Sequence, residues 1–228
     1  MQYSYTITPE DKFINVRDVL KNHFLISTRL LNKLIKFGLI YLNNVSVRPD
    51  KIVFPSDIIS FSMDFNEDSS NIIPIKMNLH IVYEDESFLI INKPSNLAVH
   101  PTSYHFTDTL SNGVKFYFDS IGLHKKIRIV NRLDRNTSGL VIIAKNEYVQ
   151  EFLIRQMKTN NFIKKYIGIV EGSFSLSHDK PSNFSNNIPG DILSTLYTGT
   201  INAPISRKPN SIIERCVSPL RRRGNYSL

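Results

Sequence analysis

Positive charge is concentrated in one short segment of this chain of 228 residues. Residues 12–62 carry eight basic and three acidic side chains, and the last eight residues carry three arginines and no acid. The remainder is balanced, with 17 basic and 17 acidic residues out of 28 and 20 in the whole chain. A small positive module on a neutral body is typical of a polyanion-binding attachment, and nucleic acid is the commonest polyanion. A solvated basic surface that improves solubility explains the charge equally well.

The overall composition is that of a globular protein. Hydrophobic residues make up 41%, aromatic residues 11% and charged residues 21%, which excludes disordered and fibrous chains. A chain of this length can bury one large core or two modest ones. The single Cys216 excludes an internal disulfide framework and a cysteine zinc cluster. Without a signal sequence or a long apolar run, we expect a cytoplasmic, soluble protein with no membrane partner.

Two short helices are predicted in the basic segment. Apolar residues between positions 14 and 24 lie mostly on one helical face, so we expect the first helix there. The second helix begins at Ser27 or Thr28, whose side chains can cap it, and ends at Gly38, a residue that readily adopts the left-handed conformation. Its apolar stripe consists of Leu30, Leu31, Leu34 and Ile35.

A hairpin and a further strand follow. Residues 40–47 turn at Asn43 and Asn44, and asparagine tolerates the positive φ of tight hairpin turns. Residues 58–62 predict another strand. With the stretch STRLLNKLIKFGLIYLNN, this arrangement resembles the S-four-like RNA-binding module. The resemblance implies RNA contacts by Arg29, Lys33, Lys36 and Arg48.

A change of composition separates this module from a second domain. Residues 64–76 combine acids, serine, asparagine and proline without periodicity, which is typical of a linker. We therefore place the module at residues 1–66, the linker at 67–76 and the second domain at 77–228. The second domain is predicted to contain a hairpin over 81–92, a helix from Thr107 or Asp108 to 118, a strand over 140–144, a helix over 147–158, a strand over 162–170 and an inserted loop over 173–200.

The stretch IVNRLDRNTSGLVIIAKN, residues 129–146, contains the best candidate for chemistry. Asp134 lies between Arg132 and Arg135, and neighbouring guanidinium groups favour the ionised carboxylate. The small residues at 137–139 permit a tight turn before a buried strand, so the carboxylate can face a cleft. The same residues are also consistent with a surface ion pair.

The motif R-L-D-x-x-T-S-G-L, followed by A-K-N, resembles the central motif of RluA-type ribosomal RNA pseudouridine synthases. Three further segments resemble that family in the same order: INKPSNLAVHP at 91–101, KKYIGIVEG at 164–172 and GTINAPISR at 199–207. The resemblance implies an α+β fold, in which the S-four-like module precedes a mixed, mainly antiparallel-sheet catalytic domain. It implies an isomerase that converts uridine to pseudouridine in structured, ribosomal RNA as a monomer, without cofactor or metal.

The resemblance makes Asp134 the catalytic carboxylate, which traps the sugar covalently or removes a proton. Tyr166 matches a tyrosine that stacks on uracil and serves in proton transfer, although it is also an ordinary strand aromatic. Arg135 is placed to bind phosphate or to occupy the space that a flipped base leaves. Arg132 is a further candidate for substrate binding, although its main expected role is to position the loop.

The segment at 91–101 permits two roles. Lys93 and His100 are candidates for RNA contact, but Pro94 and Pro101 make a rigid connector equally consistent with the sequence. The family's glycine after K-P-x is Asn96 here, and asparagine is well able to occupy a left-handed conformation.

Two further departures concern Asn131 and the end of the chain. Many relatives have histidine at position 131, whereas asparagine can hydrogen-bond but cannot titrate. An L-x-T-G-R-x-H-Q-I-R segment, whose arginine pairs with the catalytic aspartate, is missing before Leu228, so we expect an incomplete catalytic domain. The last residues, PLRRRGNYSL, suggest a frameshift. The alternatives to an enzyme are therefore a catalytically silent RNA-binding protein and an inactive frameshifted fragment.

Overall fold

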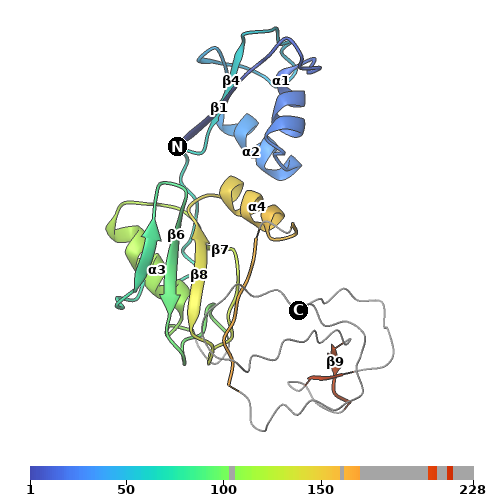
Figure 1. Cartoon of the computed structure of the whole chain (residues 1–228). Helices are drawn as coiled ribbons and strands as arrows, with labels where there is room; N and C mark the ends of the chain where they lie inside the picture. The colour runs from blue at the N-terminus through green and yellow to red at the C-terminus, as the bar shows by residue number, and fades with distance from the viewer. Residues whose placement is uncertain (103–105, 160–161, 170–204, 210–214, 218–228) are drawn as a thin grey trace, which may run out of the picture. The chain divides into compact units, whose positions relative to one another are not determined.

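The computed structural model describes residues 1–102, 106–159, 162–169, 205–209 and 215–217 (Figure 1). The chain divides into two compact units, Met1–Lys165 and Tyr166–Leu228. The inserted loop expected at 173–200 lies outside the described residues. A search of the described residues finds no helix with the length and apolar character needed to span a membrane.

A four-stranded antiparallel sheet organises the N-terminal part of the first unit. Its strands are β1 (Gln2–Thr6), β4 (Ile58–Ser62), β2 (Ile40–Leu42) and β3 (Val45–Ser46), in that spatial order. Three of these four strands were predicted. Strand β1 was missed because its partner β4 is more than 50 residues away in the sequence and no turn joins the two.

The turn between β2 and β3 has the predicted conformation. Asn43 and Asn44 have φ values of 49° and 66°. The Asn43 side chain also accepts a hydrogen bond from the backbone N–H of Ile58 at 2.8 Å and donates one to Asp57 at 2.7 Å. The turn is therefore tied to the beginning of β4 as well as closing the hairpin.

Two helical segments pack on this sheet. The first consists of α1 (Val16–Asp18), which continues as the π-helical η1 (Val19–His23), so it starts later than expected and Ile14 stays 69% exposed. Asn15 caps it, accepting from the N–H of Asp18 at 3.0 Å. Asn15 and Asp18 together form a capping box, which satisfies backbone donors at the helix start.

Helix α2 (Thr28–Phe37) has the predicted ends. The Ser27 hydroxyl accepts from the N–H of Leu30 at 3.3 Å, and Gly38 has a left-handed φ of 65°. The apolar stripe is buried except for Ile35, which is 41% exposed. The first hydrophobic core is built from Ile7, Val16, Val19, Leu20, Phe24, Ile26, Leu30, Leu31, Leu34, Ile40, Val53, Ile59, Phe61 and Met63.

A second four-stranded antiparallel sheet follows in the chain. Its order is β5 (Ile81–Glu84), β6 (Phe88–Lys93), β8 (Gly139–Ala144) and β7 (Arg128–Ile129). The β5–β6 hairpin and β8 were predicted, whereas the two-residue β7 was not, because it is too short for a periodic signal. Strands β6 and β8 pair along their whole length (Figure 1).

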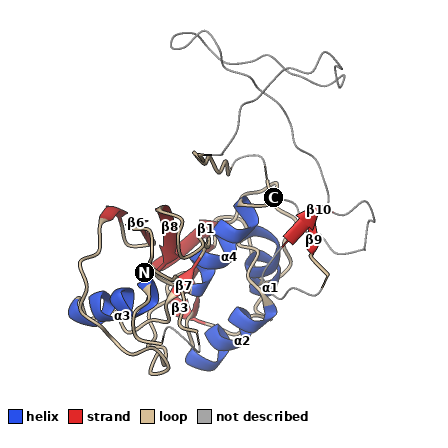
Figure 2. Cartoon of the chain, turned by 90° about the horizontal axis from the view of Figure 1, so that it is seen from below, coloured by secondary structure: helices blue, strands red, loops and turns tan. Residues whose placement is uncertain are grey.

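Helices α3 (Leu110–Ser120) and α4 (Glu147–Gln156) cover opposite faces of this sheet. Val141 and Ile143 belong to the core cluster that contains α3, whereas the neighbouring Ala144 belongs to the cluster that contains α4. Such alternation is expected because successive strand residues point to opposite faces. Strands β8 and β7 lie between the two helices in Figure 2.

The helix boundaries differ slightly from the sequence prediction. The cap of α3 is Thr109, not Thr107 or Asp108, and its backbone N–H donates to the Asn112 side chain at 3.1 Å. Helix α4 ends at Gln156, so the predicted end at 158 is wrong by two residues.

The strand predicted over 162–170 is wrong for the residues that the structure describes. Residues 162–169 contain no strand, and Ile167 and Ile169 are fully exposed. Apolar β-branched residues favour a strand, but a strand forms only with a hydrogen-bonded neighbour. In the second unit, β9 (Ile205–Arg207), which ends the GTINAPISR segment, pairs with β10 (Arg215–Val217).

The segment predicted as a linker packs against helix α3. The Asn112 side chain donates to the carbonyl of Ile73 at 2.9 Å, and the N–H of Ile75 donates to the carbonyl of Asn112 at 3.1 Å. Ser69 is buried. Residues 67–76 are therefore irregular in structure but attached to α3.

Candidate active site

The loop between β7 and β8 presents its charged residues to solvent. Leu133 is partly buried against the core beneath α3, whereas Arg132, Asp134 and Arg135 are exposed. The N–H of Thr137 donates to the backbone carbonyl of Asp134 at 3.1 Å and closes a turn. The apolar anchor holds the loop, so the flanking charges face outward where a polyanionic substrate can reach them.

Asn131 fixes the beginning of this loop to β8. Its side-chain Nδ2 donates to the carbonyl of Leu140 and its Oδ1 accepts from the N–H of Ile142, both at 2.9 Å. The side chain thus takes the place of a strand neighbour. Asparagine at this position keeps its hydrogen-bonding capacity, as expected, and uses it for the backbone of β8.

Lys93 is a buried clamp on the same loop. Its side chain is inaccessible, and its Nζ donates to the carbonyls of Pro94 and Leu97 at 2.9 Å and of Arg135 at 3.1 Å. Burial lowers the pKa of Lys93, and the nearby charge of Asp134 opposes that shift. With its donors used internally, Lys93 does not fit the RNA contact suggested from the sequence; it positions the loop with Asp134 instead.

A second hydrogen bond joins the same two loops. The Ser95 hydroxyl donates to the carbonyl of Asn136 at 2.8 Å. Sequence reasoning missed Ser95, because nothing in the local pattern shows that a distant loop lies beside it. Asn96 has a φ of 63°, the left-handed conformation expected for the residue in place of the family's glycine.

His100 lies beside the start of α3. It is partly buried, with its Nδ1 3.4 Å from the Ser111 hydroxyl. Burial lowers the pKa of His100, and the charge of Arg132 lowers it further. The backbone around it is tied to α3, since the N–H groups of Leu110 and Ser111 donate to the carbonyls of Ala98 and Val99. This arrangement supports the rigid-connector interpretation of the segment.

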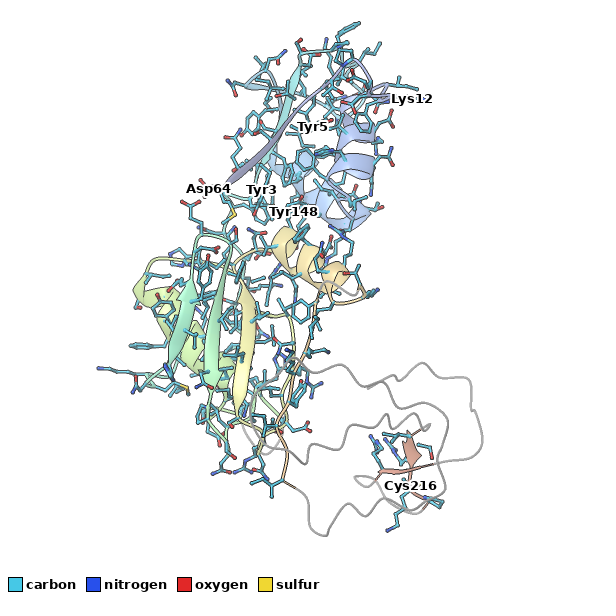
Figure 3. All side chains as sticks on the ribbon, viewed as in Figure 1. Tyr3, Tyr5, Lys12, Asp64, Tyr148 and Cys216 are labelled. Carbon is cyan, nitrogen blue, oxygen red and sulfur yellow. The ribbon has the colours of Figure 1, made fainter. Side chains whose placement is uncertain are left out.

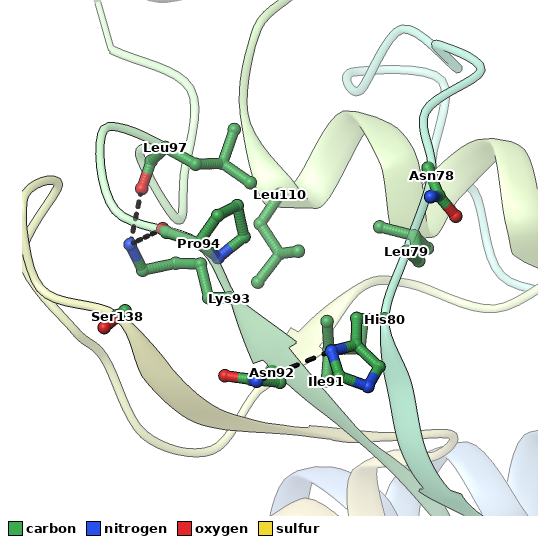
Figure 4. A pocket seen from close by; sticks show the side chains of 10 residues that line it. All are labelled: Asn78, Leu79, His80, Ile91, Asn92, Lys93, Pro94, Leu97, Leu110 and Ser138. Atoms are coloured by element: carbon green, nitrogen blue, oxygen red, sulfur yellow. Dashed lines mark hydrogen bonds between the residues drawn. The ribbon is translucent and has the colours of Figure 1, made fainter.

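A pocket of about 360 Å³ adjoins the clamp (Figure 4). It shares Lys93 and Ser138 with the two loops, and the His80 ring lies 3.5 Å from the Asn92 amide at its edge. Asp134 does not line it. The lining residues include no carboxylate and are Asn78, Leu79, His80, Ile91, Asn92, Lys93, Pro94, Leu97, Leu110 and Ser138.

The other candidate residues lie elsewhere. Tyr166 belongs to the second unit and is 65% exposed. In the N-terminal module Arg29, Lys36 and Arg48 are exposed, whereas Lys33 forms ion pairs with Glu147 and, at 3.6 Å, with Glu67. Lys33 is therefore engaged within the protein. In the part of the chain that the structure describes, no group of acidic, histidine and cysteine residues could hold a metal ion.

Comparisons with known proteins match the segment that holds this loop. The RNA pseudouridylate synthase family matches residues 87–223. The ribosomal large subunit pseudouridine synthase D of Blochmanniella floridana is 39% identical over 137 residues, covering 58% of this chain and 43% of that protein. The enzyme of the same name from Buchnera aphidicola of Acyrthosiphon pisum is 35% identical, covering 81% and 52%.

Two further similarities are to another curated protein and to a solved structure. An uncharacterised RNA pseudouridine synthase of Bacillus subtilis, YlyB, is 32% identical over 76% of this chain and 51% of that protein. One solved structure, that of human RNA pseudouridylate synthase domain containing 1, is 25% identical in sequence. The match covers 41% of this chain and 31% of the human chain, with a TM-score of 0.28. The chain spans about half the length of the curated relatives it matches. As the RluA-type motifs predicted, the chain belongs to the RNA pseudouridylate synthase family.

Proposed function

We propose that this protein isomerises uridine to pseudouridine in structured ribosomal RNA, with Asp134 as the catalytic carboxylate. The observation that carries the proposal is an exposed aspartate between two exposed arginines, on a loop that the buried Lys93 clamps from behind. Family membership and relatives named for the large ribosomal subunit support the reaction and the RNA class. A cytoplasmic location and a monomeric state remain part of the proposal.

The proposed reaction needs only one acid–base or nucleophilic group. The N1–C1′ bond of uridine breaks, the detached uracil turns, its C5 forms a bond to C1′, and a proton moves from C5 to N1. Cleavage places positive character on the sugar, which the Asp134 carboxylate can trap covalently or assist by removing a proton. Atoms and charge balance without any cofactor.

The arginines beside Asp134 match the demands of a flipped-out base. A base inside an RNA helix must leave the stack to reach the carboxylate. Arg132 and Arg135 carry the positive charge that binds the backbone phosphates on either side, and Arg135 can also fill the vacated space. Tyr166 remains the proposed partner that stacks on the uracil.

Three exposed cations in the N-terminal module form the proposed second RNA contact. Arg29, Lys36 and Arg48 have side chains in solvent, where they can pair with phosphate oxygens. We propose that residues 1–66 act as an S-four-like RNA-binding module, and we leave Lys33 out of the contact because Glu147 and Glu67 occupy it.

An Asp134→Asn variant tests the assignment. This change keeps the size of the side chain and removes its charge, so we expect no pseudouridine in an unmodified ribosomal RNA transcript, mapped by carbodiimide adduct stops. Asp119→Asn, at an exposed aspartate on α3 whose carboxylate pairs with Lys115, should retain full activity. Appreciable product from Asp134→Asn would refute its role. RNA binding without turnover by the unaltered chain would favour the silent RNA-binding alternative.

A further inference from the structure

An aromatic cluster joins the N-terminal module to helix α4. The Tyr148 ring centroid lies 4.6 Å from that of Tyr3 and 5.1 Å from that of Phe61. Tyr148 thereby packs against the first hydrophobic core, although it belongs to the second domain by sequence. Tyr3 and Tyr148 lie side by side in Figure 3, and their rings meet edge to face. The Asn146 amide adds a hydrogen bond to the Tyr3 hydroxyl at 3.2 Å.

A cluster of four charges lies at the same contact between the module and helix α4, which we call the junction. Arg128 donates to Glu67 at 2.8 Å and to Glu147 at 3.1 Å, and Lys33 of α2 pairs with both carboxylates. The side chains of Arg128, Glu67 and Glu147 are only 8%, 5% and 11% exposed. The cluster is neutral, and moving the module away would withdraw Lys33 and leave two largely buried carboxylates facing the single charge of Arg128, which is costly. Its members therefore favour one arrangement of module and domain.

Backbone contacts reinforce that arrangement. The buried Lys125 ammonium donates to the carbonyls of Met63 at 2.6 Å and of Phe65, and lies 4.3 Å from the Phe65 ring centroid. On α4, the Arg155 guanidinium donates to the carbonyl of Leu25 at 2.9 Å. The last residues of the module and the backbone at Leu25 are thus both held by residues that follow the linker.

Strand β8 separates this junction from the loop with Asp134. The junction residues Asn146, Glu147 and Tyr148 follow the end of β8, whereas the loop with Asp134 precedes its beginning. Six residues of strand span roughly 17 to 20 Å. A paired strand in the middle of a sheet is a stiff spacer, so the two ends hold a constant separation.

We propose that the junction fixes the module at one end of β8 and the Asp134 loop at the other, so that the protein selects a uridine at a set distance from an RNA segment bound by the module. The inference rests on the proposed function and narrows its substrate to folded RNA that reaches both surfaces at once. Glu147 and Tyr148 are then positioning residues for target selection, since they touch the module and not the substrate.

Distance measurements test the junction itself. Donor and acceptor dyes are attached to cysteines introduced by Val45→Cys, at a 65% exposed position, and Glu86→Cys in a Cys216→Ser chain. We expect a narrow distance distribution in this protein and a broad one after the paired changes Glu147→Gln and Tyr148→Ala. The matched control, Glu151→Gln with Tyr83→Ala, removes the same groups elsewhere and should keep the narrow distribution. We call the protein with Glu147→Gln and Tyr148→Ala the junction variant. A distance distribution of the otherwise unaltered labelled protein as broad as that of the junction variant would overturn the proposal.

Product mapping on two RNAs tests the selection. One is a folded ribosomal RNA fragment, and the other is a short hairpin presenting the same uridine alone. We expect the junction variant to lose about tenfold or more in rate on the folded fragment, or to modify other uridines, while its rate on the hairpin stays unchanged. Equal losses on both RNAs would mean that the junction only stabilises the fold and would refute the inference.

Binding separates this inference from the proposed function. If the unaltered protein modifies neither RNA, the proposed function fails, and the affinities for the same two RNAs decide the inference. The junction variant must then lose affinity for the folded fragment and keep its affinity for the hairpin. If the junction variant kept its affinity for both RNAs, the inference would be overturned.

Discussion

The ammonium of Lys93 lies 3.1 Å from the carbonyl oxygen of Arg135 and ties the end of β6 to the loop that carries Asp134. Lys93→Met would keep most of the buried hydrocarbon but leave three carbonyls without their donor. We expect a loss of about 2 to 3 kcal/mol in the free energy of unfolding and a larger loss of activity. Urea unfolding measures the first effect. Lys76→Met, at an exposed lysine, is the control, and equal midpoints for the two variants would contradict the clamp.

The Asn131 side chain bridges two backbone groups of β8, so its removal should loosen the beginning of the Asp134 loop. Asn131→Ala is expected to cost about 1 to 2 kcal/mol of stability, because the backbone of β8 loses two hydrogen-bond partners. Hydrogen exchange at the Ile142 amide should quicken. Asn136→Ala, at an exposed asparagine of the same loop, should leave that amide unaffected. Equal exchange in both variants would show that Asn131 does not hold the strand.

His100 should make stability fall in mild acid. Burial, aided by Arg132, lowers its pKa in the folded state below the usual 6.5, so the unfolded chain binds the proton more readily. The contribution of neutral His100 to stability is complete above the pKa that this residue has in the unfolded chain. It is lost as the pH falls from about 6.5 toward the lower pKa of the folded state. Thermal unfolding across that range should show a weaker pH dependence in His100→Gln. His124→Gln, at an exposed histidine, serves as control.

The Tyr117 hydroxyl should lose its proton at a higher pH than an ordinary tyrosine. Its hydroxyl donates to Glu84 at 2.6 Å, and this hydrogen bond to a carboxylate, with some burial, raises the pKa of Tyr117 to about 12. Because the folded value exceeds the ordinary 10.0, the stabilisation is complete below pH 10 and disappears as pH rises through about 12. The difference between the absorbance titrations of the native chain and Tyr117→Phe isolates this group. A difference curve centred near 10 would refute the strong hydrogen bond.

Salt dependence should distinguish the exposed cations of the module from Lys33. Replacing Arg29, Lys36 and Arg48 together by alanine is expected to lower the slope of log affinity against log salt for ribosomal RNA by roughly two to three. Lys33→Gln should leave the slope unchanged, since that ammonium faces Glu147 and Glu67. Filter binding at several salt concentrations measures both slopes. A reduced slope in Lys33→Gln would place this residue on the RNA after all.

The amino-acid sequence by itself determined the features whose causes are local. Ser27 and Gly38 delimit α2 through a side-chain cap and a left-handed residue, and Asn43 with Asn44 forms the hairpin turn by tolerating positive φ. The alternating residues of β6 and the apolar run of β8 also predicted these two strands, and the motif around Asp134 predicted the family. Each of these depends on neighbours within a few residues.

Only the tertiary structure decided the features that depend on distant partners. Strand β1 needs β4, and the strand expected at 162–170 is absent from its described residues, 162–169, which have no strand neighbour in the part of the chain that the structure describes. Lys33 and Lys93 look like ordinary basic residues in the sequence, yet Lys33 forms ion pairs with Glu67 and Glu147, and Lys93 is buried beneath the loop that carries Asp134. A charge interacts with whatever lies within a few ångströms, and folding sets those neighbours.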